Sequence, residues 1–455
     1  MGGEWRVRKI GTFAKAKGGK RLPKSIALQT EKNNHPYIRV VDFTDGKIHQ
    51  DSLLYVPNDA ISAIQRYRVA ANDVIISIVG TIGAIAQVPQ ELHGANLTEN
   101  AAKLYFTEED VDASYVAYYL KSSLGQHEIT INTVGSTQSK LPLYGIENIN
   151  VALPPLKEQQ AIACVLGSLD DKIELNRKMN QTLEEMARAI FKSWFVDFDP
   201  VHAKATVRRE HPGWTNEQIS RAACPNLKPE IAELFPDSFE DSKLGEIPRG
   251  WKVRPIGDVV QILGGGTPST KEPAYWEGSI HPFCTPKDMA SLTDPVLLQT
   301  ERHLTDKGLA KVSSGQLPLG TVLLSSRAPI GYLAVAETPI SINQGIIAMV
   351  CDGELPNLYV LHWTKSNMDR ILTNANGSTF MEISKRNFRP IAAVVPSPEV
   401  LNDFMRVVEP MHRRVVSSLK QIRQLANLRD FLLPRLISGD LVVAEGERIV
   451  GRIST

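Results

Sequence analysis

The chain alternates between two patterns of apolar and polar positions. One pattern consists of short runs rich in valine, isoleucine, threonine and aromatic residues, punctuated by glycine, proline and asparagine, which is typical of β-strands. Examples are residues 37–43, 74–78 and 322–326. The other pattern follows the prolines at 154–155 and 396–398, where apolar residues recur at gaps of three and four on one helix face. We therefore expect two strand-rich globules, each followed by a long helix, over residues 157–198 and 399–436.

The two halves of the chain repeat one another at an offset of about 245 residues. Near the start of each half the matches are Trp5, Val7, Ile10 and Gly11 with Trp251, Val253, Ile256 and Gly257. Further matches pair Gly18-Gly19 with Gly264-Gly265, Ile82-Gly83 with Ile330-Gly331, and Gly135-Ser136-Thr137 with Gly377-Ser378-Thr379. Their constant order and spacing indicate duplication of one structural unit.

The apolar stripe of each helix has the spacing of a heptad seam. In the first helix the seam includes Leu166, Leu169, Ile173, Asn176, Asn180 and Leu183, and in the second Met411, Val415, Ser418 and Ile422. Two such stripes can pair as an antiparallel coiled coil, with the polar members fixing the register. The alternative is two ordinary amphipathic core helices. Gly167 and Pro410 occupy neighbouring repeat positions, so we expect a kink or a short helix followed by a long one.

Composition excludes several protein classes. A length of 455 residues indicates two or three domains, and a net charge of +1 leaves no global field to attract nucleic acid. The longest apolar stretch, residues 74–88, is too short to span a membrane, and no secretory signal is visible, so we expect a cytoplasmic protein. The four cysteines are spaced for neither a zinc site nor a compact disulfide framework: Cys164, Cys224, Cys284 and Cys351.

Local basic character is concentrated near the N-terminus. Eight lysines and arginines lie between Arg6 and Lys24 without an acidic residue. They can contact DNA phosphates or form a solvated basic face. Between the two halves, apolar positions match whereas polar ones differ: Lys20-Arg21 against Gly266-Thr267, Arg39 against Thr285, Val79 against Arg327. Different polar residues on a shared frame suit the recognition of two different base sequences.

The Gly-Ser-Thr turns are further candidate DNA contacts. They are followed by Gln138-Ser139-Lys140 in the first half and, after a few residues, by Lys385-Arg386-Asn387 in the second. The alternative is that these turns serve only the backbone shape. The predicted DNA-binding residues are Lys20, Arg21, Arg39, Thr81, Ser136, Thr137, Gln138, Lys140, Thr267, Arg327, Ser378, Thr379, Lys385 and Arg386.

The sequence gives no support for catalysis. Leu153-Pro154-Pro155-Leu156 lacks the amide or carboxylate and the aromatic ring that an amino-methyltransferase motif requires. The glycines at 264–266 do not precede the Gly-Lys-Ser/Thr of a phosphate-binding loop. Residues 199–243 are expected to form a connector with one short helix near 215–223.

Five segments of the sequence together resemble the specificity subunit of type I restriction-modification enzymes. They are LPPLKEQQ at 153–160, FKSWFVDF at 191–198, LGEIPRGW at 244–251, GGTPST at 265–270 and LLPRLISGDL at 432–441. The resemblance implies an α+β fold with two similar target recognition domains separated by two long helices that pair as an antiparallel coiled coil, in a pseudo-twofold repeat. It implies these segments: domains at 1–155 and 244–397, helical spacers at 156–198 and 398–441, a connector at 199–243 and a tail at 442–455.

The resemblance also implies a non-catalytic subunit that recognises the two halves of a bipartite DNA site. Its helices are expected to set the spacing and dock two modification (methyltransferase) subunits, with restriction (endonuclease/translocase) subunits joining. No cofactor is expected on this chain, because S-adenosylmethionine, ATP and Mg²⁺ belong to the partner subunits. The other hypotheses are a stand-alone methyltransferase or nuclease, and a helical scaffold that does not recognise DNA.

Overall fold

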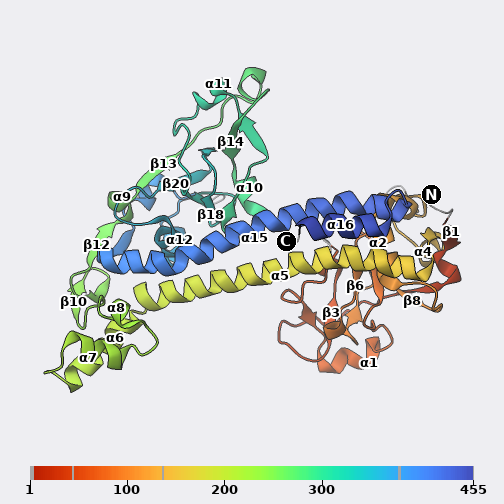
Figure 1. Cartoon of the computed structure of the whole chain (residues 1–455), viewed down its shortest axis with the longest axis horizontal. Helices are drawn as coiled ribbons and strands as arrows, with labels where there is room; N and C mark the ends of the chain where they lie inside the picture. The colour runs from red at the N-terminus through yellow and green to blue at the C-terminus, as the bar shows by residue number, and fades with distance from the viewer. Residues whose placement is uncertain (1–4, 44–45, 136–137, 378–380, 454–455) are drawn as a thin grey trace. The chain divides into compact units, whose positions relative to one another are not determined.

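The computed structural model describes residues 5–43, 46–135, 138–377 and 381–453 (Figure 1). It divides into two compact units, residues 1–175 with 421–455 (unit 1) and residues 176–420 (unit 2). Each unit contains one globule and one half of each long helix, α5 (Leu156–Phe195) and α15 (Pro398–Ser438). The division therefore cuts across both helices, whereas the sequence segments treat each helix as a separate spacer.

Unit 1 is built from three small sheets. Their strand orders are β2-β8-β5-β6, β4-β3-β7 and β1-β9. The strands are β1 (Arg6–Lys9), β2 (Ala14–Gly18), β3 (Pro36–Ile38), β4 (Leu54–Tyr55), β5 (Val74–Ser77), β6 (Ile85–Gln87), β7 (Asn96–Leu97), β8 (Ala101–Phe106) and β9 (Asn150–Leu153). The globule's helices are α1 (Ile61–Ile64), α2 (Ala113–Lys121), α3 (Ser123–Ile131) and α4 (Leu143–Asn148), and α16 (Val443–Ile453) follows α15.

Unit 2 repeats this arrangement. The sheets of its globule have the orders β13-β20-β17-β18-β15, β16-β14-β19 and β12-β21. The strands are β12 (Lys252–Pro255), β13 (Gln261–Gly264), β14 (His281–Cys284), β15 (Val296–Leu297), β16 (Arg302–Leu304), β17 (Val322–Ser325), β18 (Leu333–Ala336), β19 (Ser341–Ile342), β20 (Ile346–Val350) and β21 (Ala392–Val395). Its helices are α9 (Ile256–Val259), α10 (Pro286–Ala290), α11 (Asp306–Leu309), α12 (Asn357–Ser366), α13 (Met368–Thr373) and α14 (Lys385–Phe388).

The duplication is reproduced in individual hydrogen bonds. The Tyr115 hydroxyl donates to the Ala152 carbonyl at 2.6 Å, and the Tyr359 hydroxyl donates to the Val394 carbonyl at 2.6 Å. Central strands β5 and β17 are buried along their whole length, which explains their continuous apolar sequence. The predicted α+β fold with an internal repeat is confirmed.

The long helices pair antiparallel in unit 2. The Ser418 hydroxyl donates to the Asn176 carbonyl at 3.4 Å, while Phe191 and Phe404 pack edge to face with 6.0 Å between ring centroids. Later residues of α5 thus face earlier residues of α15. The predicted seam residues are buried or half-buried in the unit to which each belongs: Leu166, Leu169 and Ile173 in unit 1 with Ile422, and Asn176, Asn180, Leu183, Met411, Val415 and Ser418 in unit 2.

In unit 1 the helical pair is tied to the globule by an ion-pair network. Asp170 on α5 accepts from the Tyr118 hydroxyl on α2 at 2.8 Å and from Arg429 on α15 at 2.8 Å. Burial raises the pKa of Asp170, but the Arg429 guanidinium and the Tyr118 hydroxyl outweigh it and hold the pKa below its usual value. The carboxylate is therefore charged and links three elements.

Three sequence predictions are corrected. Each long helix is one continuous helix, of 40 and 41 residues, through Gly167 and Pro410, so a short helix followed by a long one is wrong. Residues 199–243 form more than one short helix: α6 (Asp199–Glu210), α7 (Asn216–Ala223), α8 (Pro229–Ala232) and the hairpin β10 (Phe239–Ser242) with β11 (Gly245–Pro248). The expected strand 37–43 ends at Ile38, because the Asp42 carboxylate accepts from the Arg39 backbone N–H and turns the chain.

The connector folds around a buried lysine. The Lys204 ammonium on α6 donates to the carbonyls of Ala232 and Phe235 at 2.9 and 2.5 Å. The cation satisfies the carbonyl of Ala232, the last residue of α8, and that of Phe235 just beyond it, and so ties α6 to this part of the connector. No helix in the part of the chain that the structure describes is long and apolar enough to cross a membrane.

Candidate nucleic-acid interface

A tight glycine contact fixes the same loop in both units. A Cβ on Gly19 would lie 2.1 Å from the Thr98 carbonyl oxygen, and one on Gly265 would lie 1.7 Å from the Ile342 carbonyl oxygen. The backbone N–H of the next residue donates across this contact in each unit. Lys20 N–H donates to the Leu97 carbonyl at 2.8 Å, and Gly266 N–H donates to the Ile342 carbonyl at 3.1 Å. Only glycine permits this approach, and it places residues 20–21 and 266–267 at equivalent positions.

In unit 1 this loop presents two cations. The Lys20 carbonyl accepts from the Tyr37 hydroxyl at 2.8 Å, so its backbone is fixed while its side chain is exposed. Arg21 donates to Glu99 at 2.5 Å but remains 73% exposed. Burial raises the pKa of Glu99, yet its hydrogen bonds and the Arg21 charge give a net lowering. Burial also raises the pKa of Tyr37 to about 12, so its hydroxyl stays a donor.

Backbone hydrogen bonds connect the segment 97–100, which contacts this loop, to the region of two more predicted residues, Thr81 and Lys140. The Asn100 carbonyl accepts from Ile78 N–H at 2.8 Å, and the Ile78 carbonyl accepts from Leu141 N–H at 3.0 Å. Lys140 pairs with Val79 in a β-bridge. Thr81 is exposed in the same turn, where its carbonyl accepts from the Ser77 hydroxyl. We call Lys20, Arg21, Thr81 and Lys140 the unit 1 rim.

Unit 2 has the same framework with different side chains. Ser326 N–H donates to the Gly345 carbonyl at 2.9 Å, and Thr267 donates to the Gln344 side chain at 2.6 Å. Arg327 pairs with Glu382 in a β-bridge and lies 3.8 Å from its carboxylate. We call Thr267, Arg327, Gln344 and Glu382 the unit 2 rim.

The structure aligns the residues after the two Gly-Ser-Thr turns differently from the sequence prediction. The position of Lys140 in unit 1 is occupied in unit 2 by Glu382, because Val79–Lys140 and Arg327–Glu382 are the same bridge. Lys385 and Arg386 instead begin helix α14, the counterpart of α4. Gln138 is exposed beside Lys140, whereas Ser136, Thr137, Ser378 and Thr379 lie outside the described residues. Sequence comparison missed Glu99, Gln344 and Glu382, the acceptors that orient the rim cations and hydroxyls.

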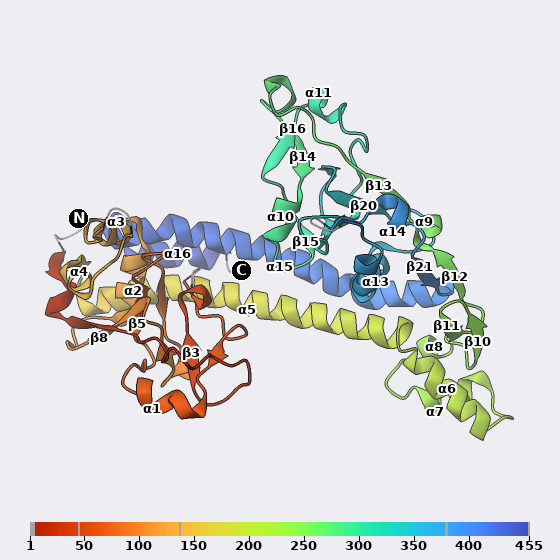
Figure 2. The same ribbon diagram turned by 180° about the vertical axis from the view of Figure 1, so that it is seen from behind.

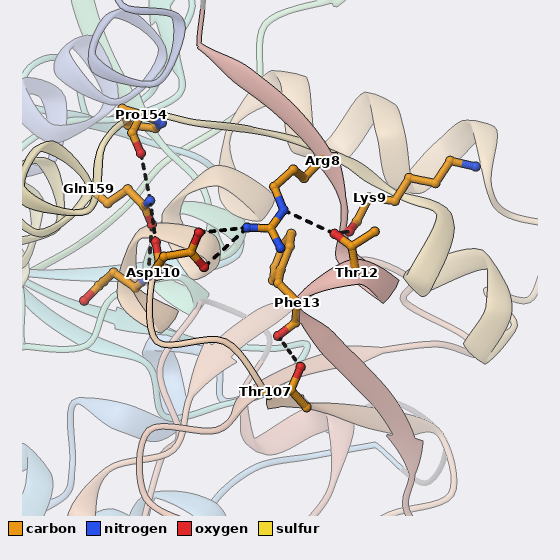
Figure 3. Close-up of polar contacts among 9 residues, drawn as sticks. Arg8, Lys9, Thr12, Phe13, Thr107, Asp110, Pro154 and Gln159 are labelled. Atoms are coloured by element: carbon orange, nitrogen blue, oxygen red, sulfur yellow. Dashed lines mark hydrogen bonds and ion pairs between the residues drawn. The ribbon is translucent and has the colours of Figure 1, made fainter.

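Much of the N-terminal basic stretch serves the framework. Figure 3 shows the Arg8 guanidinium directed at Asp110, while the Lys9 side chain points away. The Arg8–Asp110 ion pair measures 3.0 Å, and Arg254–Glu354 repeats it in unit 2. Lys15 donates to the Gly11 carbonyl at 3.1 Å. A pair kept in both units supports the shared fold, so we assign Arg8 to structure.

Arg39 is also engaged internally. Its guanidinium donates to both oxygens of the buried Asp42 carboxylate at 2.7 and 3.0 Å and to the Ser52 carbonyl at 2.8 Å. The equivalent Thr285 makes the same kind of contact with Asp288 at 2.7 Å. The difference between Arg39 and Thr285 therefore belongs to the frame, and we leave Arg39 out of the proposed interface.

The segment 153–156 is a strand-to-helix junction. The Gln159 side-chain amide donates to the Pro154 carbonyl at 2.8 Å (Figure 3). The Gln159 side-chain oxygen accepts from the Asp112 backbone N–H at 2.9 Å. Gln159 thus holds the first turn of α5 against the globule. Among the described residues, no group of three or more histidine, cysteine or acidic side chains is arranged to hold a metal ion.

The rims offer donors suited to nucleic acid. Exposed lysine and arginine side chains contact phosphates and guanine edges, and threonine hydroxyls and amides contact base edges. The frame beneath them is the same in both units and the donors differ. This geometry fits two surfaces that discriminate different base sequences.

Comparisons with known proteins agree with this geometry. A family model described as "Type I restriction modification DNA specificity domain" matches residues 2–185 and 248–403. The HindI specificity subunit of a type I restriction enzyme from Haemophilus influenzae is 30% identical over 327 residues, 65% of this chain and 70% of the relative. The MjaIX specificity subunit from Methanocaldococcus jannaschii is 39% identical over 163 residues, 35% of this chain and 38% of the relative.

A solved structure shares the fold. The S subunit of a type I restriction-modification system from M. genitalium aligns with a TM-score of 0.56 at 15% identity. The alignment covers 95% of this chain and 96% of that one.

Proposed function

The chain belongs to the type I restriction-modification DNA specificity family, and from this premise we propose that it is the DNA recognition subunit of such a complex. Each unit recognises one half of a bipartite DNA site, and the long helices set the spacing. The observation that supports this most directly is the contrast between matched frames and unmatched rims. Lys20, Arg21 and Lys140 in unit 1 stand where Gly266, Thr267 and Glu382 stand in unit 2.

In this proposal, DNA methylation and cleavage are carried out by other subunits of the complex. The chain is non-catalytic, works in the cytoplasm, and docks two methyltransferase subunits through its helical pair. Restriction subunits with endonuclease and translocase activity join this core. The proposal assigns S-adenosylmethionine, ATP and Mg²⁺ to these partners. This chain has neither the motif that holds an amino group for methylation nor a phosphate-binding loop.

A salt-titration experiment tests the unit 1 rim. The chain is assembled with its methyltransferase subunits, and binding to a target duplex is measured by fluorescence anisotropy over a series of KCl concentrations. Lys20→Ala and Lys140→Ala are each expected to weaken binding and to reduce the slope of log K against log[KCl] by about 1. Lys228→Ala, which removes an exposed lysine from the connector, is the control.

Two outcomes contradict parts of the proposal. Unchanged affinity and slope in both variants would remove these lysines from the interface. A wild-type complex that binds target and unrelated duplexes equally would support the scaffold hypothesis instead, since a scaffold shows no sequence preference.

A further inference from the structure

Unit 2 contains an open cleft between α13 and α14 that unit 1 does not reproduce chemically. Its volume is about 810 Å³. The polar residues that line it include Asp369, Arg370, Asn374, Asn376, Arg386 and Asn387. Figure 2 shows α13 and α14 close together, with α14 beside β13 and β20. We call this feature the α13–α14 cleft.

The asparagines of the cleft support its backbone and the arginines supply its charge. Asn387 donates its side-chain amide to the Asn374 carbonyl at 3.0 Å, and Asn374 donates to the Arg370 carbonyl at 2.8 Å. Arg370 makes one long contact, 3.5 Å, to the Asn367 side chain. Both Arg370 and Arg386 are exposed, and Asp369 is the acidic side chain that lines the cleft with them. The cleft is therefore cationic and rich in donors.

The matching surface of unit 1 has neither of these two arginines. Arg370 corresponds to Glu128, whose carboxylate accepts from the Asn150 backbone and side chain at 2.8 and 3.2 Å. Arg386 corresponds to Tyr144, which is 63% exposed. Two other lining positions, Thr373 and Asn376, correspond to the exposed apolar Ile131 and Val134, while Asn374 keeps an asparagine, Asn132, in unit 1. Beside the cleft, Val79 and Leu143 of unit 1 stand in place of Arg327 and Lys385.

The cleft adjoins the unit 2 rim. Asn376, which lines the cleft, pairs through its backbone with Glu382, with hydrogen bonds of 2.9 Å in both directions. Glu382 also bridges to Arg327. A duplex held at the rim thus has a cationic surface directly beside it. Guanidinium groups match phosphate geometry with two parallel donors.

We propose that the α13–α14 cleft binds backbone phosphates of the DNA that flanks the half-site recognised by unit 2, through Arg370 and Arg386. The inference rests on the proposed function and deepens it. Unit 1 lacks this phosphate contact, so the two units hold DNA unequally. The contact is independent of base sequence and adds affinity without changing the target.

Arginine substitutions in the assembled complex test this contact. Binding of the complex to a target duplex and to a duplex of arbitrary sequence is measured over a range of KCl concentrations. Arg370→Ala and Arg386→Ala are each expected to lower affinity for both duplexes by the same factor and to reduce the salt slope by about 1. Arg386→Lys keeps the charge and is expected to retain the wild-type slope. Tyr144→Ala, at the matching position of unit 1, is expected to leave the slope unchanged.

The outcomes separate this inference from the proposed function. If wild type prefers its target but Arg370→Ala with Arg386→Ala leaves the slope unchanged, the cleft does not contact phosphates and only this inference is overturned. If the double variant instead fails to assemble with methyltransferase subunits in size-exclusion chromatography, the cleft is a protein contact and the inference is also overturned. If wild type shows no target preference, the proposed function itself fails.

Discussion

Removing Arg429 from unit 1 is expected to destabilise that unit strongly. The Asp170 side chain is 12% exposed, and Arg429 and Tyr118 each donate to one of its oxygens at 2.8 Å. Breaking a buried ion pair by removing one partner costs roughly 3–5 kcal/mol. Arg429 is 31% exposed, so water can partly replace it, and we expect about 2–3 kcal/mol for Arg429→Met. For a domain of about 200 residues this corresponds to a fall in Tm of about 4–12 °C.

Differential scanning calorimetry of the purified chain at pH 7 measures this effect. Arg221→Ala is the control, because the Arg221–Glu217 pair has the same charges on an exposed helix face, with side chains 65% and 56% exposed. An exposed pair contributes less than about 1 kcal/mol. The reasoning is refuted if Arg429→Met unfolds within about 1 °C of the wild type.

The dependence of stability on pH provides a second test of the Asp170–Arg429 pair. The pKa of Asp170 is lower in the folded chain than its ordinary value. Its contribution to stability is therefore complete above about pH 4, the unfolded pKa, and is lost as the pH falls through the folded pKa. The stability difference between wild type and Asp170→Asn should be constant from pH 5 to pH 8. It should shrink below about pH 4.

Three further predictions concern the frame. Gly19→Ala is expected to lower the free energy of unfolding, measured in urea, by about 1–3 kcal/mol, because the new Cβ overlaps the Thr98 carbonyl. Gly18→Ala is the control, since a Cβ there meets nothing within 4 Å and the variant should unfold like the wild type. Equal effects of the two substitutions would contradict the close approach at Gly19. Arg8→Ala should cost under about 1 kcal/mol in the same assay and leave the salt slope of DNA binding unchanged; a reduced slope would return Arg8 to the interface. Burial lowers the pKa of His362 to about 3, so the unfolded chain binds a proton at higher pH than the folded chain does. The free energy of unfolding should therefore fall by up to about 1.4 kcal/mol per pH unit below about pH 6.5, and this dependence should be absent in His362→Phe. Parallel pH curves for the two proteins would exclude His362 as the cause.

The frame was predictable because it depends on patterns that are local or repeated. Gly19 and Gly265 matched at a constant offset, and both prove to be positions that a Cβ cannot occupy. The heptad positions from Leu166 to Ile422 identified both helix faces, since burial imposes that spacing. Pro410 was misleading, because α15 stays helical across it.

Partners formed across space were not predictable from one sequence. Nothing local links Asp170 to Arg429 or Arg8 to Asp110, so the sequence alone does not show that Arg8 pairs with an acidic side chain. The 242-residue offset already pairs Lys140 with Glu382, whereas the basic residues 385–387 belong to the next element. The same offset would also have revealed Arg370 opposite Glu128 and Arg386 opposite Tyr144.

The central claim is that this chain directs a methyltransferase to one bipartite DNA sequence. Long-read sequencing of methylated bases in the host genome, with the gene intact and deleted, tests it most directly. The account predicts that methylation at a single motif, two short half-sites separated by a fixed gap, disappears on deletion. Identical methylation maps, with the partner genes still expressed, would contradict it.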